Sequence, residues 1–171
     1  GCGNMGRGHI SYFPQVARMR FTAAADEVPA ALERIAKEHP QVKLFSDPLA
    51  LIHSGEVDAI IIATPHYSHP PLTLAAFKAG VHVLVEKPVA VTALAAEEVN
   101  QAHKKYRKLV YGAMFQQRMT PAYRKVRELI QTGELGTIRR TNWIITSWFR
   151  SQAYYNSGGW RATWAGEGGG V

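Results

Sequence analysis

The sequence has little of what marks secreted or membrane-spanning proteins. It contains one cysteine in 171 residues, which excludes an internal disulfide framework and fits the reducing cytoplasm. This residue, Cys2, lies inside a glycine turn, which favours a small filler over a nucleophile. No apolar run approaches the roughly 20 residues that a membrane-spanning helix needs. We therefore expect a globular cytoplasmic protein with no membrane partner.

Acidic residues are also few, since 13 Asp and Glu stand against 20 Lys and Arg and give a net charge of +7. The basic residues gather at 103–108, 124–127 and 139–140. We assign the first group to the end of a helix, where cations complement the helix dipole, and the second to the solvated face of another helix. No zinc-finger spacing or nucleic-acid-binding motif accompanies them, so we expect no nucleic-acid partner.

Short apolar segments of strand composition alternate with segments of helical composition. Strands are predicted at residues 20–25, 43–45, 58–63, 81–85 and 109–115. Helices are predicted at residues 4–13, 29–39, from 48 onward, 72–79 and 93–106. This alternation is typical of an α/β fold, in which helices cover both faces of a doubly wound parallel sheet.

The first six residues carry a glycine motif of the form G-x-G-x-x-G before a predicted helix. Such glycines let the backbone approach a pyrophosphate at the helix N-terminus. Asp26 closes the next strand twenty residues after Gly6, a spacing that suits a carboxylate on an adenosine ribose, although an ordinary helix cap is the alternative. We predict a Rossmann-type NAD(P) site that includes Gly1, Gly3, Asn4, Met5, Gly6 and Asp26.

Asp26 also bears on the choice of cofactor. Together with Glu27 it would place two carboxylates near any 2′-phosphate, and no arginine or lysine follows until Arg34. We therefore expect NAD to be preferred over NADP. The central strand that should precede Gly1 in such a sheet is missing, so we expect a fragment of a protein roughly twice this length.

The strand at residues 81–85 ends in Glu86-Lys87-Pro88. Proline stops the strand, which leaves two charges at the carboxyl end, where open α/β sheets bind their ligands. A solvated pair that merely closes a strand is the alternative. The preceding strand ends in a polar loop with His66 and His69, which have no metal partner at ligand spacing, so we expect a turn or cofactor contact there and no metal.

The pattern changes near residue 120. Thr120 and Pro121 open a helix that Gly133 ends, and residues 137–149, with aromatics at Trp143, Trp148 and Phe149, are predicted to form a long strand. We divide the chain into a dinucleotide-binding domain, 1–119, and the beginning of a second domain, 120–171. The second is expected to be α+β with a large, open, mainly antiparallel sheet, whose exposed face favours a homo-oligomer, a dimer or tetramer.

Taken together, these residues resemble the Gfo/Idh/MocA family of oxidoreductases over the whole chain. The motifs that carry the resemblance are the glycines of residues 1–6, Asp26, Ala63-Thr64-Pro65 with His69, Glu86-Lys87-Pro88, Gln117-Arg118 before Pro121-Ala122-Tyr123, Gly133-Glu134-Leu135-Gly136, and Trp160-Arg161 with Gly168-Gly169-Gly170. The glycine motif alone is weak, whereas Glu-Lys-Pro at the end of the strand at residues 81–85 is specific.

The resemblance implies an NAD(P)-dependent enzyme that passes a hydride to or from a sugar, polyol or related carbonyl compound. It implies that catalytic Lys87 lies between nicotinamide and substrate, with a cis Lys87–Pro88 bond. The residues implied to line the cofactor are Ala63, Thr64, Pro65, His66, His69 and Glu86. Those implied to meet the substrate, besides Lys87, are Arg118, Trp160 and Arg161. The aspartate and histidine that complete the site in relatives would lie beyond Val171.

Two alternatives remain open at this point. One is a glycosidase of the same fold that uses bound NAD for transient oxidation, and the other is a non-catalytic regulator that senses the cofactor. A histidine in the helix after Val171 favours chemistry, and its absence favours sensing.

Overall fold

A computed structural model describes residues 1–147, 149–156 and 158–168 of the protein. Contacts divide the chain into two compact units. The first holds Gly1–Met114 together with the segment that begins at Ala162, and the second is Phe115–Arg161.

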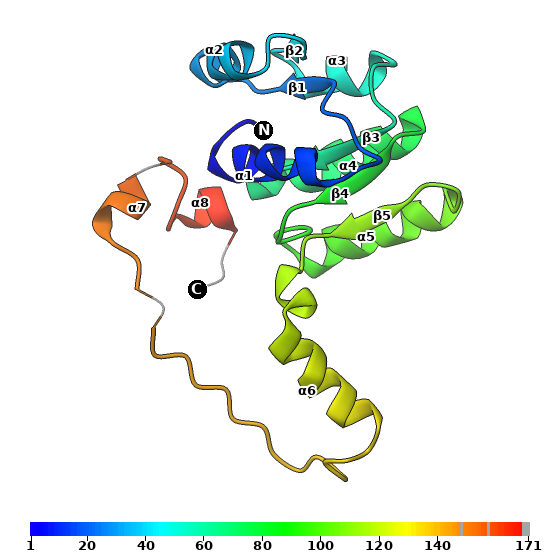
Figure 1. The fold of residues 1–171 in the computed structure, drawn as a ribbon, viewed down its shortest axis with the longest axis vertical. Coiled ribbons are helices and arrows are strands. Elements are labelled where there is room, and N and C mark those ends of the chain that lie inside the picture. Colours follow the sequence, from blue (N-terminus) through cyan, green and yellow to red (C-terminus); the bar gives the residue numbers. More distant parts are fainter. Residues whose placement is uncertain (148, 157, 169–171) are drawn as a thin grey trace. The chain divides into compact units, whose positions relative to one another are not determined.

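The first unit alternates strands and helices, as the sequence predicts (Figure 1). Its strands are β1 (Ala23–Ala25), β2 (Lys43–Phe45), β3 (Ala59–Ile62), β4 (His82–Val85) and β5 (Tyr111–Ala113). Its helices are α1 (Asn4–Tyr12), α2 (Pro29–Glu38), α3 (Pro48–His53), α4 (His69–Ala79), α5 (Ala93–Lys105) and α8 (Trp164–Glu167), with 3₁₀ turns η1 (Phe13–Gln15) and η2 (His66–Ser68).

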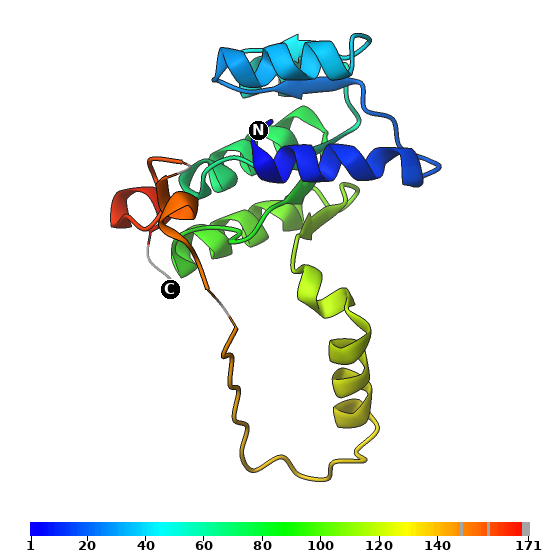
Figure 2. The same cartoon turned by 60° about the vertical axis from the view of Figure 1, so that its left-hand side comes forward.

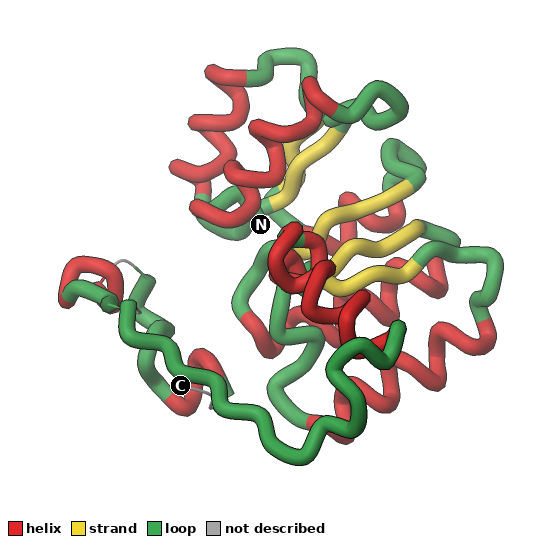
Figure 3. Tube along the Cα trace, turned by 60° about the horizontal axis from the view of Figure 1, so that its bottom comes forward, coloured by secondary structure: helices red, strands yellow, loops and turns green. Residues whose placement is uncertain are grey.

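All strand pairs of this unit are parallel, which confirms the predicted Rossmann-type sheet. β1 pairs with β2, and β3, β4 and β5 form a second group in that order. Figure 3 shows the two groups of strands in yellow. A Rossmann sheet has the order 3-2-1-4-5-6, so the space between β1 and β3 is the place of its central strand.

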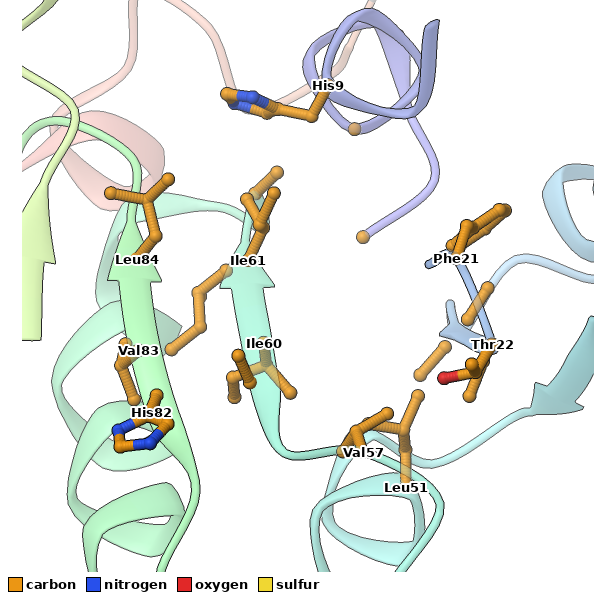
Figure 4. A pocket seen from close by; sticks show the side chains of 18 of the residues that line it. His9, Phe21, Thr22, Leu51, Val57, Ile60, Ile61, His82, Val83 and Leu84 are labelled. Atoms are coloured by element: carbon orange, nitrogen blue, oxygen red, sulfur yellow. The ribbon is translucent and has the colours of Figure 1, made fainter. Parts of the chain in front are cut away.

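A cavity of about 670 Å³ occupies that space. Phe21 and Thr22 line one side of it and Ile60 and Ile61 of β3 the other (Figure 4). The apolar lining on both sides is what a buried central strand would require.

The core lies mainly between β3–β5 and the helices that cover them. Helices α4 and α5 lie side by side along this sheet (Figures 1 and 2). Phe77 of α4, Val85 of β4 and Val99 of α5 are fully buried in one apolar cluster. A smaller cluster joins Cys2 and Ile35 near β1. Burial of β4 therefore fixes the strand whose end carries Glu86 and Lys87.

Side-chain caps set several element ends. Asp47 accepts hydrogen bonds from the Leu49 and Ala50 N–H groups at the start of α3, and Thr92 accepts one from Ala95 N at the start of α5. Gly80, with φ 78°, ends α4 in the left-handed conformation that favours glycine. Helix α4 begins at His69, three residues earlier than the composition suggests.

The second unit contains a 3₁₀ turn, η3 (Gln116–Met119), and the helices α6 (Pro121–Gln131) and α7 (Gln152–Asn156). The predicted strand at residues 137–149 is wrong for the described part of this segment, 137–147 and 149, which has no strand. A strand needs a neighbouring backbone to pair with, and no described segment pairs with it. Trp143 instead stacks on Tyr123 of α6, with ring centroids 5.4 Å apart. Trp148 lies outside the described residues.

Candidate active site

Two of the three glycines of the N-terminal motif are required by close packing. A Cβ on Gly1 would lie 2.6 Å from the carbonyl oxygen of Ala63, and one on Gly6 would overlap the carbonyl oxygen of Gly1. Gly3 is exposed and has open space where a side chain would stand. The outer glycines therefore seat the loop against the end of β3, and the middle one leaves its backbone accessible to a ligand.

The N-terminus of α1 opens onto this space. Gly3 is its N-cap, with no side-chain cap, and Asn4 and Met5 are exposed in the first turn. The free N–H groups and the helix dipole at this point favour an anion such as a pyrophosphate.

Asp26 follows β1 and lies beside the glycine loop. Its Oδ2 accepts a hydrogen bond of 2.6 Å from Cys2 N, and its Oδ1 accepts one of 2.9 Å from Val28 N. Asp26 is not the N-cap of the following helix, which was the alternative, because the N-cap of α2 is Val28. Each carboxylate oxygen has a further lone pair, so Asp26 retains the capacity to accept from a ribose hydroxyl.

The loop after β3 brings Ala63, Thr64, Pro65 and His66 to the same edge of the sheet. Ser68 Oγ donates a 2.7 Å hydrogen bond to Thr64 Oγ1. Between α8 and η2, His66 Nδ1 lies 3.2 Å from the carbonyl oxygen of Glu167. Burial lowers the pKa of His66, and the side chains of His69 and Lys87 act in the same direction.

His69 is fully buried behind this loop. Its Nε2 lies 2.8 Å from the carbonyl oxygen of Thr64 and its Nδ1 lies 2.6 Å from that of Pro88. The structure therefore has His69 joining the loops after β3 and β4, rather than exposing its ring to a ligand.

Glu86 is 5% exposed, which is unusual for a carboxylate without partners. Its Oε1 lies 2.8 Å from Nε2 of His9 on α1, and its Oε2 accepts a 3.1 Å hydrogen bond from Lys87 N. The alternative of a solvated Glu86–Lys87 pair is wrong, because Glu86 is buried and paired with His9. Sequence reasoning missed His9, whose only signal was a polar ring on the apolar face of the helix that follows the glycines.

Lys87 is exposed at the carboxyl end of β4, and the Lys87–Pro88 peptide bond is cis, as the resemblance implies. Among the described residues no carboxylate pairs with its ammonium. A lysine without a carboxylate partner at this edge of the sheet can hold a substrate oxygen and stabilise negative charge that develops on it.

Of the residues implied to meet the substrate in the second unit, Arg161 and Trp160 are in contact with each other. The Arg161 guanidinium lies 4.6 Å from the ring centroid of Tyr154 and 4.8 Å from that of Trp160, and its Nη1 donates a 2.8 Å hydrogen bond to the Tyr154 hydroxyl. Arg118 lies over Phe115 at 5.0 Å. Their contact with a substrate stays a prediction.

Further observations concern metal binding, membrane-spanning helices and the single cysteine. In the part of the chain that the structure describes, no three His, Cys, Asp or Glu side chains gather in a way that could hold a metal ion, and no helix is long and apolar enough to cross a membrane. Cys2 is buried, with Sγ 3.6 Å from the carbonyl oxygen of Ala25, and burial raises the pKa of its thiol. This supports a filler rather than a nucleophile.

The profile of a family described as "Oxidoreductase family, NAD-binding Rossmann fold" (GFO_IDH_MocA) matches residues 1–114. The chain belongs to this oxidoreductase family. The matched range includes the glycine loop, Asp26 and Glu86-Lys87-Pro88, so the family's NAD-binding fold and the site described above are the same part of the chain.

Similar proteins with known names are dehydrogenases. Inositol 2-dehydrogenase 2 of Saccharopolyspora erythraea is 32% identical over 137 residues, which are 80% of this chain and 40% of the relative. The scyllo-inositol dehydrogenase of Lactobacillus casei with bound NAD(H) and scyllo-inositol is 28% identical, with a TM-score of 0.72 over 80% of this chain and 40% of that one.

A third relative extends the structural likeness to nearly the whole chain. The WlbA dehydrogenase of Bordetella pertussis in complex with NADH and UDP-GlcNAcA is 25% identical, with a TM-score of 0.85 over 98% of this chain and 48% of that one. This oxidoreductase-family chain therefore spans less than half the length of each of these relatives.

Proposed function

We propose that the protein is an NAD-dependent oxidoreductase that transfers a hydride between nicotinamide and a hydroxyl-bearing carbon of a sugar or polyol. The observation that carries this proposal is the exposed ammonium of Lys87, which no described carboxylate pairs, at the same edge of the sheet as the dinucleotide loop. The dinucleotide is held by the N-terminus of α1 and the glycine loop, with Asp26 toward the ribose and the loop after β3 toward the nicotinamide end.

NAD and Lys87 have different roles in the proposed hydride transfer. Bound NAD supplies the hydride acceptor. Lys87 would hold the substrate hydroxyl, lower its pKa and stabilise the negative charge that develops on its oxygen as the hydroxyl proton leaves. Loss of the hydride from the adjoining carbon then gives the carbonyl product. No residue in the described part of the chain is assigned as the base that takes the proton.

The substrate class follows from the relatives' own ligands. The named relatives act on or bind inositols and a nucleotide-linked sugar, and all of these are rings with adjacent hydroxyls. We propose a cyclic polyol or a sugar ring, with Arg118, Trp160 and Arg161 as further contacts. The glycosidase and regulator alternatives gain no specific support.

NAD is proposed over NADP because Asp26 and Glu27 would repel a 2′-phosphate. Isothermal titration calorimetry with each cofactor tests this choice. We expect binding of NAD to be at least about tenfold tighter, a free-energy difference of ~1.4 kcal/mol. Equal affinity would refute the assignment of Asp26 to the ribose.

We also propose a domain division, an oligomeric state and a cellular location. We propose that a second domain begins near residue 120 and that the exposed apolar side chains of its extended segment, among them Ile144 and Phe149, are covered in a homo-oligomer. The single cysteine supports a cytoplasmic location.

Substitution of Lys87 tests the function once one alcohol substrate is found by screening polyols and sugars for NADH formation. We expect Lys87→Met to lower kcat and kcat/KM together by about 10²-fold or more, or ~2.7 kcal/mol, with little change in NAD affinity. Lys78→Met, an exposed lysine of α4, is the matched control and should leave kcat unchanged. Near-normal turnover by Lys87→Met would move catalysis elsewhere, and failure to find any substrate would favour the regulator.

A further inference from the structure

The pair formed by His9 and Glu86 joins two parts of the site that lie far apart in the sequence. His9 projects from α1 across the carboxyl ends of β3 and β4 (Figure 4). Its Nε2 lies 2.8 Å from Glu86 Oε1, and the exposed fractions of the two side chains are 15% and 6%. An interaction this deep is screened little by solvent, and a carboxylate buried there needs its partners.

Glu86, held by His9, in turn binds the backbone of Lys87. Its second oxygen, Oε2, accepts the hydrogen bond from Lys87 N. Both carboxylate oxygens are thus engaged, one by a helix and the other by the backbone of the residue that carries the ammonium. The backbone of β3 holds Glu86 from the other side, since Glu86 N donates to Ile62 O at 2.9 Å.

Helix α1 connects His9 to the glycine loop of the cofactor site. Arg7 N donates to Gly3 O at 2.9 Å, so the helix is continuous from the glycine loop, and His9 lies in its second turn. A continuous helix moves as one body over such a short distance. The position of the phosphate-binding N-terminus and the position of His9 are therefore linked.

We propose that His9 is a positioning residue, which through Glu86 fixes the backbone of Lys87 relative to the dinucleotide-binding end of α1. This inference rests on the proposed function. His9 itself does not act as the proton acceptor, because the nitrogen that faces the strand ends is engaged by Glu86. Its contribution is geometric: the lysine and the bound dinucleotide keep one fixed separation, which hydride transfer requires.

Three variants of His9 test this inference in the full-length protein. His9→Leu and His9→Asn remove the contact, since an asparagine amide does not reach the place of Nε2. His9→Gln restores a donor at that place. We expect the first two to lower kcat by about tenfold or more, because a misplacement near 1 Å costs up to about 10²-fold, with the dissociation constant for NAD changed less than about threefold. His9→Gln should recover most of the lost kcat.

The matched control is His103, whose Nε2 lies 2.9 Å from the carbonyl oxygen of Leu109. His103→Leu loses a comparable contact on α5, away from Lys87. It should lower the thermal midpoint about as much as His9→Leu does, yet leave kcat unchanged. Equal loss of kcat in both variants would show that His9 acts only through general stability and would overturn the inference.

A second measurement does not depend on turnover. Amide hydrogen exchange at Lys87, followed by NMR, should be about tenfold faster or more in His9→Leu and His9→Asn than in the wild type, and unchanged in His103→Leu. Unchanged exchange at Lys87 in both His9 variants would overturn the inference. A wild-type protein that fails to bind NAD or to oxidise any alcohol would instead refute the proposed function, while the exchange result would still decide whether His9 holds Lys87.

Discussion

Three histidines near the ends of β3 and β4 differ in what surrounds them. His9 meets a buried carboxylate, His69 meets two carbonyl oxygens, and His66 is only partly buried. The same side chain therefore pairs with the carboxylate beside Lys87 in one place, joins two loops in another, and in the third lies against the carbonyl oxygen of Glu167. At the residue scale, function follows from the partner and not from the residue type.

His66 gives a prediction about pH. Burial lowers its pKa below the ordinary 6.5, so the folded protein binds a proton here less readily than the unfolded chain does. As the pH falls through about 6.5, the unfolded state gains its proton first, and the free energy of unfolding decreases. An NMR titration of the His66 ring should therefore have its midpoint below 6.5.

The variant His66→Gln provides the control for this prediction. It should flatten the fall in the free energy of unfolding between about pH 7 and pH 5, measured by urea denaturation at each pH. A ring midpoint at or above 6.5 would contradict the burial argument.

At the element scale, the ends of helices are where local sequence is most informative. Asp47 with Pro48, Thr92 and Gly80 mark ends that the structure has at those places. Each acts through its own backbone neighbours, so no distant contact is needed. The segment 137–149 is the opposite case, because a strand exists only where a second backbone pairs with it.

Asp47 gives the prediction at this scale. Its carboxylate accepts from two N–H groups at 2.9 and 3.2 Å, and α3 is only six residues long. Asp47→Ala should lower the free energy of unfolding by about 1 kcal/mol, measured by urea denaturation. Asp47→Asn, which keeps an acceptor oxygen, should lose much less; an equal loss would assign the effect to charge instead of capping.

At the scale of the whole molecule, the dominant feature is the cavity between β1 and β3. Strands on both sides present unpaired edges and apolar side chains to it, Phe21 from one side and Ile60 from the other. An apolar strand in this space would pair with both edges and complete a continuous parallel sheet.

This geometry predicts the effect of adding such a strand. A chain extended before Gly1 by about six residues of valine and isoleucine should have a thermal midpoint at least about 3 °C higher, since ~1 kcal/mol shifts the midpoint of a chain of this size by about 2–4 °C. An extension of equal length made of serine and asparagine is the control. Equal midpoints for the two extensions would mean that the cavity does not accept a strand.

Local patterns in the sequence determined much of the fold and part of the site. Alternating apolar segments and capping residues indicated the order of strands and helices, and the glycine motif with Asp26 and Glu86-Lys87-Pro88 indicated where a dinucleotide and a catalytic lysine would meet. The signals for the fold succeed because each depends on neighbours in the chain: a turn that only glycine allows, or a strand that proline ends. The roles of the site residues stay a prediction.

Only the tertiary structure decided which side chains share that site. His9 and Glu86 are 77 positions apart and His69 and Pro88 are 19 apart, and nothing in either local pattern names the partner. Burial of Glu86 and His69 depends on how α1 and α4 pack against the sheet. Such packing is a property of the assembled layers. The same physics left the described part of residues 137–149 without a strand, because pairing is decided by the neighbour and not by β propensity.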